Sequence, residues 1–386
     1  MPPAILALNA GSSSLKFALF HADGQASLRG EIEGLGATPS LTAHGPDGAA
    51  VDAPTLPGRS QEDLLGALLA WIDGRLGPDR LAAAGHRVVH GGERFEAPVR
   101  IDDATLAELD ALVPLAPLHQ PHNLAPIRAI AAARPGLPQV ACFDTAFHRT
   151  MPPVARRLAL PPALTGAGLR RYGFHGLSYE FIAGRLAILD PALAAGRVVA
   201  AHLGSGASLC ALRAGRSIET TMSFTALDGL VMATRPGCLD PGVLLYLMQE
   251  HGMTADALED LLYHHSGLAG LTGTSGDMRA LQASAGPTAR DALELFAYRA
   301  AGETAALASA LGGLDGLVFT AGIGEHDPAT RAAVCARLAW LGLVLDPAAN
   351  VAGHGRISSP ASRIATWVIP TDEEAVIARH TQALLA

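Results

Sequence analysis

A strand–turn–strand segment occurs twice in this chain, half a chain length apart. In the first copy, residues 5–20, a run of apolar residues breaks at small polar residues and then resumes. The second copy, residues 198–212, places Gly204 where the first has Gly11, at an offset of 193 positions in a chain of 386 residues. A repeat on this scale predicts a duplicated α/β domain, with each half presenting a small-residue turn to one side of a cleft.

The first turn has the composition of a phosphate-binding loop. Backbone N–H groups and hydroxyls of such a turn can surround a phosphate, and Lys16 adds a compact cation. Lys16 is the only lysine among 28 lysine and arginine residues, which favours a specific use for it. An ordinary hairpin with a solvent-facing lysine is the alternative. A third glycine turn, 321–325, follows another apolar run, and the chain has no GxxxxGK[ST] motif, so it is not a P-loop enzyme.

Composition excludes several classes of protein. A chain with 49% hydrophobic residues can bury two cores, and a net charge of −8 without runs of like charge argues against a nucleic-acid surface. The four cysteines lie far apart and form no CxxC pair, as expected of idle thiols in a reducing compartment. Neither a signal peptide nor an apolar run of the ~18 residues that a membrane helix needs is present. We expect a cytoplasmic protein that binds no membrane.

Two charged residues accompany buried strands and are candidates for a site. Arg87 lies inside an apolar strand, where it needs an anionic partner. Asp144 ends the strand predicted at 139–145, at the sheet edge where open α/β folds bind ligands, although an N-cap role is an alternative. His86, His90 and Glu93 invite a metal interpretation, but zinc enzymes carry HExxH on a helix, and this segment is a strand.

Helix signals give some polar residues a structural explanation. We expect helices at about 60–76, 124–133, 178–189 and 289–311, the third capped by Ser178. Thr371 and Glu374 have the spacing of a capping box, which leaves Glu373 without a structural role. Asp277 and Arg279 follow a Thr-Ser-Gly turn, where they could contact a ribose or form only an exposed ion pair.

Taken in order, ten short segments resemble the acetate and propionate kinase family across nearly the whole chain. They are NAGSSSLK (9–16), GHRVVHGGE (85–93), APLH (116–119), FDTAFHRTMP (143–152), RYGFHG (171–176), HLGSGAS (202–208), DGLVMATR (228–235), GDMR (276–279), FTAGIGE (319–325) and PTDEEAVIA (370–378). Their number and order make the resemblance far more specific than any one of them.

The resemblance implies the fold of the superfamily that includes actin, sugar kinases and heat-shock chaperone ATPases. Two ribonuclease-H-like domains of βββαβαβα type would then surround a nucleotide cleft, in agreement with the repeat. The first would comprise residues 1–148 and 374–386, and the second residues 149–373. ATP or ADP as co-substrate, Mg²⁺ (with Mn²⁺ possible) and a homodimer are also implied.

Site residues follow from the resemblance position by position. The catalytic positions are Arg87, Asp144, His175 and Arg235, and the metal positions are Asn9 and Glu373. The first phosphate loop comprises Asn9, Ser12, Ser14 and Lys16. The nucleotide-binding positions are His202, Leu203, Gly204, Ser205, Gly206, Asp277, Met278, Arg279, Gly322, Ile323, Gly324, Glu325 and His326. Beside the acyl group lie Arg87, Val89, Leu118, His119, Phe174 and Ala226, of which Val89, Leu118, Phe174 and Ala226 would form an apolar wall.

The chain departs from the family pattern at several positions. Ser205 and His326 stand where the family has asparagine, Asp372 replaces the asparagine of PTNEE, and Leu177 replaces a threonine. Ala226 replaces a proline near the acyl pocket, which leaves the preferred chain length of the substrate open.

The implied reaction is direct, reversible, in-line transfer of the ATP γ-phosphoryl group to acetate. Because the acceptor is already ionised, Asp144 would position Mg²⁺, its waters or an arginine instead of removing a proton. Arg87, Arg235 and His175 would stabilise the transferring group. A propionate or butyrate kinase is one alternative, since a pocket separates one methylene by only about 1–3 kcal/mol. An actin- or chaperone-like ATPase switch is a distant alternative.

Overall fold

The chain divides into two compact units. The computed structural model describes residues 4–11, 14–35, 38–56, 60–76, 80–166 and 168–385. Unit 1 comprises Met1–Phe147 together with Asp372–Ala386, and unit 2 comprises His148–Thr371. The boundaries expected from the sequence lie one residue away at the first junction and two at the second. The assignment of each unit as an independent domain stays a prediction.

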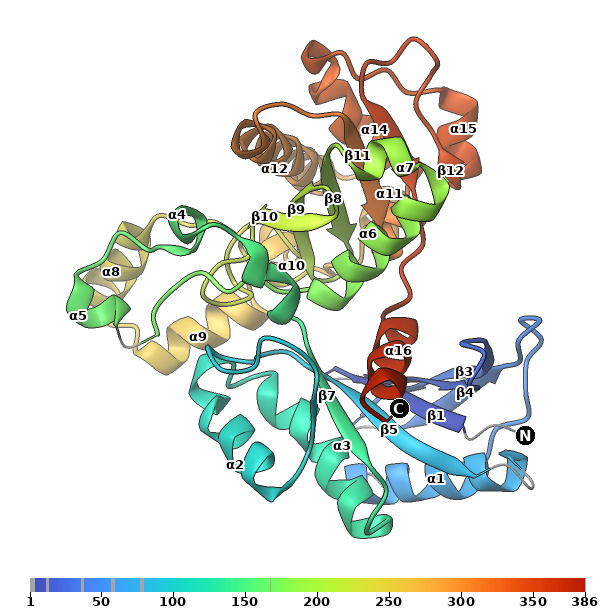
Figure 1. The fold of residues 1–386 in the computed structure, drawn as a ribbon. Helices are drawn as coiled ribbons and strands as arrows, with labels where there is room; N and C mark the ends of the chain where they lie inside the picture. The colour runs from blue at the N-terminus through green and yellow to red at the C-terminus, as the bar shows by residue number, and fades with distance from the viewer. Residues whose placement is uncertain are drawn as a thin grey trace. The chain divides into compact units, whose positions relative to one another are not determined.

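Unit 1 contains a seven-stranded mixed sheet in the order β4-β3-β2-β1-β5-β7-β6 (Figure 1). Its three central strands, β1, β5 and β7, are parallel, and the others pair antiparallel. The strands are β1 (Ala4–Ala10), β2 (Ser14–Phe20), β3 (Ala26–Glu33), β4 (Ser40–His44), β5 (Leu81–Val88), β6 (Val99–Arg100) and β7 (Gln139–Phe143). The helices are α1 (Gln61–Leu76), α2 (Asp103–Ala111), α3 (Gln120–Ala133) and α16 (Glu373–Leu385), with 3₁₀ turns η1 (Val113–Leu115) and η2 (Ala146–Thr150), the latter spanning the junction.

Alternation along β1 separates the two faces of this sheet. Leu6 and Leu8 belong to the core formed with α1 and α3. Successive side chains of a strand point to opposite faces, so Asn9 lies on the other face, against which α16 packs. Gly85 of β5 permits this packing, because a Cβ there would lie 2.2 Å from the Thr381 Oγ1 atom of α16. The C-terminal helix therefore completes the first sheet.

Unit 2 contains a six-stranded sheet in the order β10-β9-β8-β11-β13-β12. Its strands are β8 (Arg197–Leu203), β9 (Ala207–Arg213), β10 (Arg216–Thr220), β11 (Gly316–Thr320), β12 (Gly355–Arg356) and β13 (Ala365–Val368). Long helix α12 (Pro287–Leu311) packs on β8, β9 and β10. The other helices are α4 (Pro153–Arg156), α5 (Pro162–Thr165), α6 (Gly176–Leu189), α7 (Pro191–Ala194), α8 (Pro241–Glu250), α9 (Ala255–His264), α10 (Gly267–Thr272), α11 (Met278–Ala283), α13 (Ala321–His326), α14 (Pro328–Arg337) and α15 (Pro347–Ala352), with a 3₁₀ turn η3 (Ala339–Leu341).

The two sheets share one topology, which confirms the predicted duplicated α/β fold. The order β3-β2-β1-β5-β7 in unit 1 corresponds to β10-β9-β8-β11-β13 in unit 2. A shift of 193 residues carries the bounds of β1 and β2 onto those of β8 and β9. Asn9 thereby corresponds to His202, and both lie at the carboxyl end of the first strand of their sheet.

Three local expectations were wrong. Helix α6 begins at Gly176, so Ser178 lies inside it and does not cap it. The predicted capping box of α16 is absent, since the Asp372 carboxylate accepts from the Ala375 N–H group instead. The third glycine segment is not a turn but helix α13, and the Ala321 N–H group at its start donates to the Glu325 carboxylate. Within the described residues, no helix is long and apolar enough to cross a membrane.

Candidate active site

Three polar residues of unit 1 lie where its parallel strands end. Asn9 is near the end of β1, Arg87 is near the end of β5, and Asp144 directly follows β7. The register pairs Leu8 with His86 and Val88 with Phe143, so the three strands end level with one another. The carboxyl ends of parallel strands form the binding edge of an open sheet.

Arg87 and Asp144 form a buried ion pair at this edge. Arg87 donates from Nε at 3.0 Å and from Nη2 at 2.6 Å, both to Oδ2 of Asp144. The side chain of Asp144 is 1% exposed and that of Arg87 is 18% exposed. Burial alone would lower the pKa of Arg87, but the charges of Asp144, Glu373 and Glu374, together with the hydrogen bonds to Asp144, outweigh it and raise the pKa above its usual value. Arg87 is therefore a permanent cation in a fixed orientation.

Asn9 links this pair to the start of α16. Its Oδ1 atom accepts from Arg87 Nη1 at 3.3 Å, and its Nδ2 atom donates to Glu373 Oε2 at 2.8 Å and to Glu374 Oε1 at 3.1 Å. Burial raises the pKa of Glu373 to about 7, with Arg87 opposing the shift and Asp144 and Glu374 adding to it. The four charged groups thus form one coupled set around Asn9.

The carboxylates of this set are compatible with the magnesium site that the family resemblance implies. Oδ1 of Asp144 is buried and has no hydrogen-bond partner among the described residues, so it can accept from a metal-bound water. No three His, Cys, Asp or Glu side chains form a metal-holding group within the described ranges. Mg²⁺ typically takes one or two carboxylates and completes its shell with water and phosphate oxygens. Glu373 and Glu374, the two carboxylates that Asn9 contacts, are a donor set of that size.

Lys16 belongs to the same face as Asn9. The two residues are direct partners across the antiparallel β1–β2 pair, and directly opposed side chains share a face. Lys16 is exposed, and Ser14 begins β2. Ser12, the other predicted phosphate-loop serine, lies outside the described residues.

In unit 2, His175 and His202 stack on each other. Their ring centroids are 4.1 Å apart and the ring planes meet at 20°. His175 adopts a left-handed backbone conformation with φ of 57°, which is uncommon for a residue with a side chain and clusters at functional sites. Buried His148 holds this segment, with its Nε2 atom 2.8 Å from the Phe174 carbonyl oxygen.

Arg235 meets His175 at the turn between β8 and β9. A Cβ atom on Gly206 would lie 2.7 Å from Arg235 Nη2 and 3.4 Å from His175 Nε2. Arg235 also donates from Nη1 to the Ala226 carbonyl oxygen at 2.7 Å. The absence of a side chain at Gly206 therefore leaves two nitrogen donors close to the turn backbone, as an anion site requires.

Two further segments that were predicted to bind the nucleotide also belong to unit 2, and the first of them begins at Gly276. A Cβ on Gly276 would lie 2.3 Å from the Ala233 carbonyl oxygen, so the segment with Asp277, Met278 and Arg279 packs against the one that carries Arg235. Asp277 caps α11 and pairs with exposed Arg279 at 3.0 Å. That pairing gives both side chains a structural role.

The α13 segment is anchored from within. Glu325 Oε1 accepts from the N–H groups of Ala321 and Thr371, at 2.8 and 3.1 Å. Arg331, which is fully buried, donates to the Gly324 and Glu325 carbonyl oxygens. Glu325 therefore holds this segment in place, and its assignment to nucleotide binding stays a prediction. Gly322, Ile323 and His326 are at least partly exposed.

The predicted acyl-pocket residues are divided between the units. Val89, Leu118 and His119 belong to unit 1, where His119 immediately precedes α3. Phe174 and Ala226 belong to unit 2. Val89 and Phe174 are buried, and Leu118, His119 and Ala226 are partly exposed. His86, considered above as a metal ligand, is buried and bonded to Gln139 at 2.8 Å.

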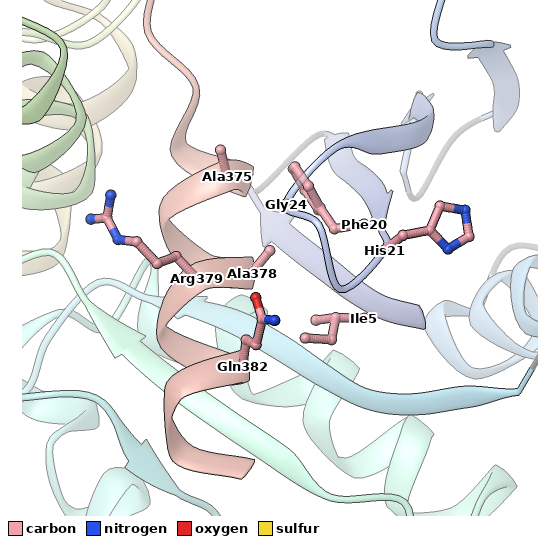
Figure 2. Close-up of a pocket in the computed structure, with 8 residues that line it drawn as sticks. All are labelled: Ile5, Phe20, His21, Gly24, Ala375, Ala378, Arg379 and Gln382. Carbon is pink, nitrogen blue, oxygen red and sulfur yellow. The ribbon is translucent and has the colours of Figure 1, made fainter. Parts of the chain in front are cut away.

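A cavity of about 200 Å³ lies on the α16 face of the first sheet, away from these residues (Figure 2). It is lined by Ile5, Phe20, His21, Gly24, Ala375, Ala378, Arg379 and Gln382. Ile5 and Phe20 pair near the start of β1, whereas Asn9 is near its end. In Figure 2 the Arg379 side chain points away from the β1–β2 hairpin.

Several residues that support the site were not found from the sequence. They are His148, Tyr179, Ser208 and Arg331, together with Ser178, Thr371 and Glu374, to which capping roles had been assigned. Buried hydroxyls and a buried arginine carry no periodic or spacing signal. The FDTAFHRTMP segment was the one pointer to His148.

Comparisons with known proteins identify the family. The Acetokinase family matches residues 4–379. The chain is 54% identical to "Acetate kinase" of Rhodopseudomonas palustris, covering all of this chain and 99% of that protein, and 46% identical to "Acetate kinase" of Deinococcus radiodurans, covering 98% of each.

Solved structures agree in fold over the full length. A propionate kinase from Francisella tularensis is 36% identical with a TM-score of 0.92, and the two cover 99% of each other. The acetate kinase of Porphyromonas gingivalis is 35% identical with a TM-score of 0.86, over 100% of both chains. These matches show that the chain belongs to the acetokinase family, whose members are kinases that phosphorylate a carboxylate.

Proposed function

We propose that this protein transfers the γ-phosphoryl group of ATP to acetate, reversibly and in a single in-line step. The observation that carries the proposal is the Arg87–Asp144 pair beside Asn9 and Glu373: a fixed cation next to carboxylates that suit magnesium. Acetate, as named for the most similar curated relatives, fits this cation as a carboxylate acceptor.

The charged and polar residues of the site have different roles in the proposed reaction. Arg87 binds the acetate carboxylate and meets the transferring phosphoryl group, and Asp144 keeps the guanidinium in place. In unit 2, Arg235 and His175 donate hydrogen bonds to the phosphoryl oxygens, and the turn at Gly204, Ser205 and Gly206 contacts the nucleotide phosphates. No base is required, since acetate is ionised at neutral pH. Positioning and charge stabilisation supply most of the acceleration.

Glu373 and Asn9 are the proposed magnesium positions. Glu373 would hold the ion through its carboxylate, and Asn9, whose amide nitrogen faces Glu373, would orient that carboxylate. Asp144 would accept from water in the ion's shell through Oδ1. Bound there, Mg²⁺ would neutralise the β- and γ-phosphate oxygens.

Acyl phosphate formation tests the proposal directly. ATP, Mg²⁺ and acetate, propionate or butyrate are incubated with the enzyme, and the acyl phosphate is trapped with hydroxylamine. We expect acetate to give the highest kcat/KM and propionate a lower one. A preference for propionate would move the assignment within the family, towards the neighbour from Francisella tularensis, and implicate Ala226. Absence of acyl phosphate from all three would overturn the proposal.

We also propose that the protein is a homodimer that associates through α8. All ten residues of α8 are described and none is buried, although Val243, Leu245, Tyr246 and Met248 are large and apolar. A helix so apolar on its surface gains stability by covering that surface. ATP as co-substrate and four cysteines that form no disulfide fit a location in the cytoplasm.

A further inference from the structure

The stacked histidines of unit 2 are each held by a pair of hydroxyl groups. His175 Nδ1 is 2.8 Å from Ser208 Oγ, which is 2.5 Å from the Tyr179 hydroxyl oxygen. His202 Nδ1 is 2.8 Å from Ser178 Oγ, which is 2.9 Å from Thr371 Oγ1. Both rings thus contact a serine through the same nitrogen, and each serine is followed by a second hydroxyl.

The protons in each chain of hydroxyls can be followed. A serine hydroxyl has one proton, so it can donate to only one neighbour. When Tyr179 donates to Ser208, Ser208 donates to Nδ1 of His175, and the ring proton must be on Nε2. When Thr371 donates to Ser178, the same reasoning puts the proton of His202 on Nε2.

We propose that Ser208 with Tyr179, and Ser178 with Thr371, are positioning residues that keep His175 and His202 neutral, with the proton on Nε2. His175 then acts as an uncharged hydrogen-bond donor toward the transferring phosphoryl group. The catalytic part of this inference rests on the proposed function, whereas the assignment of the ring protons does not.

Burial makes these hydroxyl contacts consequential. Ser178, Tyr179 and Ser208 are all inaccessible to solvent, so water cannot easily replace a lost hydroxyl. The stack and the arginine provide the reason for neutrality. Two protonated rings 4.1 Å apart would repel each other, and His175 Nε2 already shares the Gly206 turn with Arg235 Nη2. Arg235 supplies the positive charge beside the transferring phosphoryl group, and His175 supplies an uncharged hydrogen-bond donor of fixed orientation.

The second chain also reaches the nucleotide segment. The Thr371 N–H group donates to Glu325, which in turn accepts from the Ala321 N–H group. The Thr371 hydroxyl therefore connects the His202 ring with the same residue that holds α13. Removal of this hydroxyl should disturb His202 first and leave the backbone hydrogen bond intact.

Ring nitrogen NMR tests the proton assignment without substrate. In protein labelled with ¹⁵N in its histidine rings, the signals of His175 and His202, assigned with His175→Gln and His202→Gln, should show Nε2 protonated and Nδ1 not, near pH 7.5. Tyr179→Phe should introduce the other tautomer of His175, and Thr371→Val that of His202. A wild-type spectrum with protonated Nδ1 atoms would overturn the proposal, whatever the enzyme's activity.

Kinetics test the catalytic part. Ser208→Ala and Tyr179→Phe should lower kcat about tenfold or more with little change in the KM for ATP, as for loss of a transition-state donor. Thr371→Ser should restore what Thr371→Val loses. Thr304→Val is the matched control, since Thr304 is a buried threonine of α12 bonded only to its own helix, at 2.7 Å from the Ala300 carbonyl oxygen.

Two outcomes separate this inference from the proposed function. Wild-type kcat in both Ser208→Ala and Tyr179→Phe, within twofold, would contradict the positioning role even if acyl phosphate is formed normally. An inactive wild-type enzyme with the expected ring protonation would instead contradict the proposed function and leave the hydroxyl chains as assigned.

Discussion

The two carboxylate oxygens of Asp144 lie in different environments. Oδ2 accepts twice from Arg87, whereas the buried Oδ1 has no partner within the described part of the chain. A buried polar atom left unpaired costs roughly 1–3 kcal/mol. A ligand that pairs with Oδ1 recovers this cost only when bound, so the residue favours the loaded state of the site.

Replacement of Asp144 by asparagine removes the charge of this side chain and keeps its shape. The amide fits the same space but removes the carboxylate that fixes the Arg87 guanidinium, and we expect kcat to fall about 10²- to 10³-fold. Steady-state kinetics with acetate measure this. Asp110→Asn is the matched control, because Asp110 pairs with Arg128 on the exposed surface. Equal losses in both variants would show that the pair has no special role.

Glu373 predicts a pH-dependent magnesium requirement. Its pKa of about 7 means that protons compete with the metal below that pH, so the apparent affinity for Mg²⁺ should fall about tenfold per pH unit. The Mg²⁺ concentration for half-maximal activity, measured between about pH 6 and pH 8, gives the slope. Glu294→Gln, at an exposed carboxylate on α12, should keep the wild-type slope.

The same shift has a consequence for stability. The folded protein retains a proton on Glu373 between about pH 4.5 and 7, where the unfolded chain has released it. The free energy of unfolding therefore decreases as the pH rises through 7. Glu373→Gln should raise the Tm of the metal-free protein at about pH 8 while it weakens the binding of Mg²⁺. A lower Tm would contradict the raised pKa.

At the scale of elements, strand β5 carries a titratable group into the core. His86 is 1% exposed and its Nε2 atom contacts Gln139 of β7. Burial lowers its pKa to about 4, with the hydrogen bond to Gln139 opposing the shift. Unfolding exposes the ring, which then takes up a proton below about pH 6.5.

Acid should therefore destabilise unit 1 through His86. Relative to neutral pH, the free energy of unfolding should be lower at pH 5 by about 2 kcal/mol on account of this group. Urea unfolding of wild type and His86→Gln at both pH values measures the term, since glutamine can still donate to Gln139 but does not titrate. The difference between the two proteins should shrink or reverse on acidification. A constant difference would contradict the lowered pKa.

Local signals explain which elements were predictable. The β1–β2 and β8–β9 hairpins follow from short apolar runs broken by small residues, and Arg87 needed an anion because its strand is apolar. Helix α13 was predicted as a turn because its glycines indicate a break. The hydrogen bonds that Glu325 accepts from the Ala321 and Thr371 N–H groups could not be read from the sequence. Asp372 caps α16 because Arg29 and the Ala375 N–H group meet its carboxylate, and strand pairing brings Arg29 there.

The site was predictable where it followed the strand ends and not where it depends on packing. Arg87 and Asp144 were singled out from their strands as well as from family motifs, and Asn9 from a family motif alone; the parallel register brings the three together. The Ser208–Tyr179 pair joins a strand and a helix about thirty positions apart, and no periodicity relates them. Their hydroxyls are visible as site residues only once the fold has buried them.

For the whole molecule, α8 provides a test of assembly. Leu245→Glu on the apolar surface should convert the proposed dimer to monomer, because a carboxylate buried in an interface without a partner costs roughly several kcal/mol. Sedimentation velocity measures the change. Ile188→Glu, at a residue of α6 that is 72% exposed, is the matched control and should leave the mass unchanged. A wild-type monomer at micromolar concentration would contradict the proposal.

Unit 1 consists of two separate stretches of the chain, and this determines the order in which its elements are synthesised. Strands β1, β2, β5 and β7 are translated before all of unit 2, but the helix that packs on them, α16, is translated after it. Until then, the face around Gly85 lacks Ile377 and Thr381. Unit 2 is contiguous, so all of it is translated while the first sheet still lacks its C-terminal helix. Because Glu373 arrives with that helix, a chain stalled before it would lack the proposed metal site as well as the cover of its first sheet.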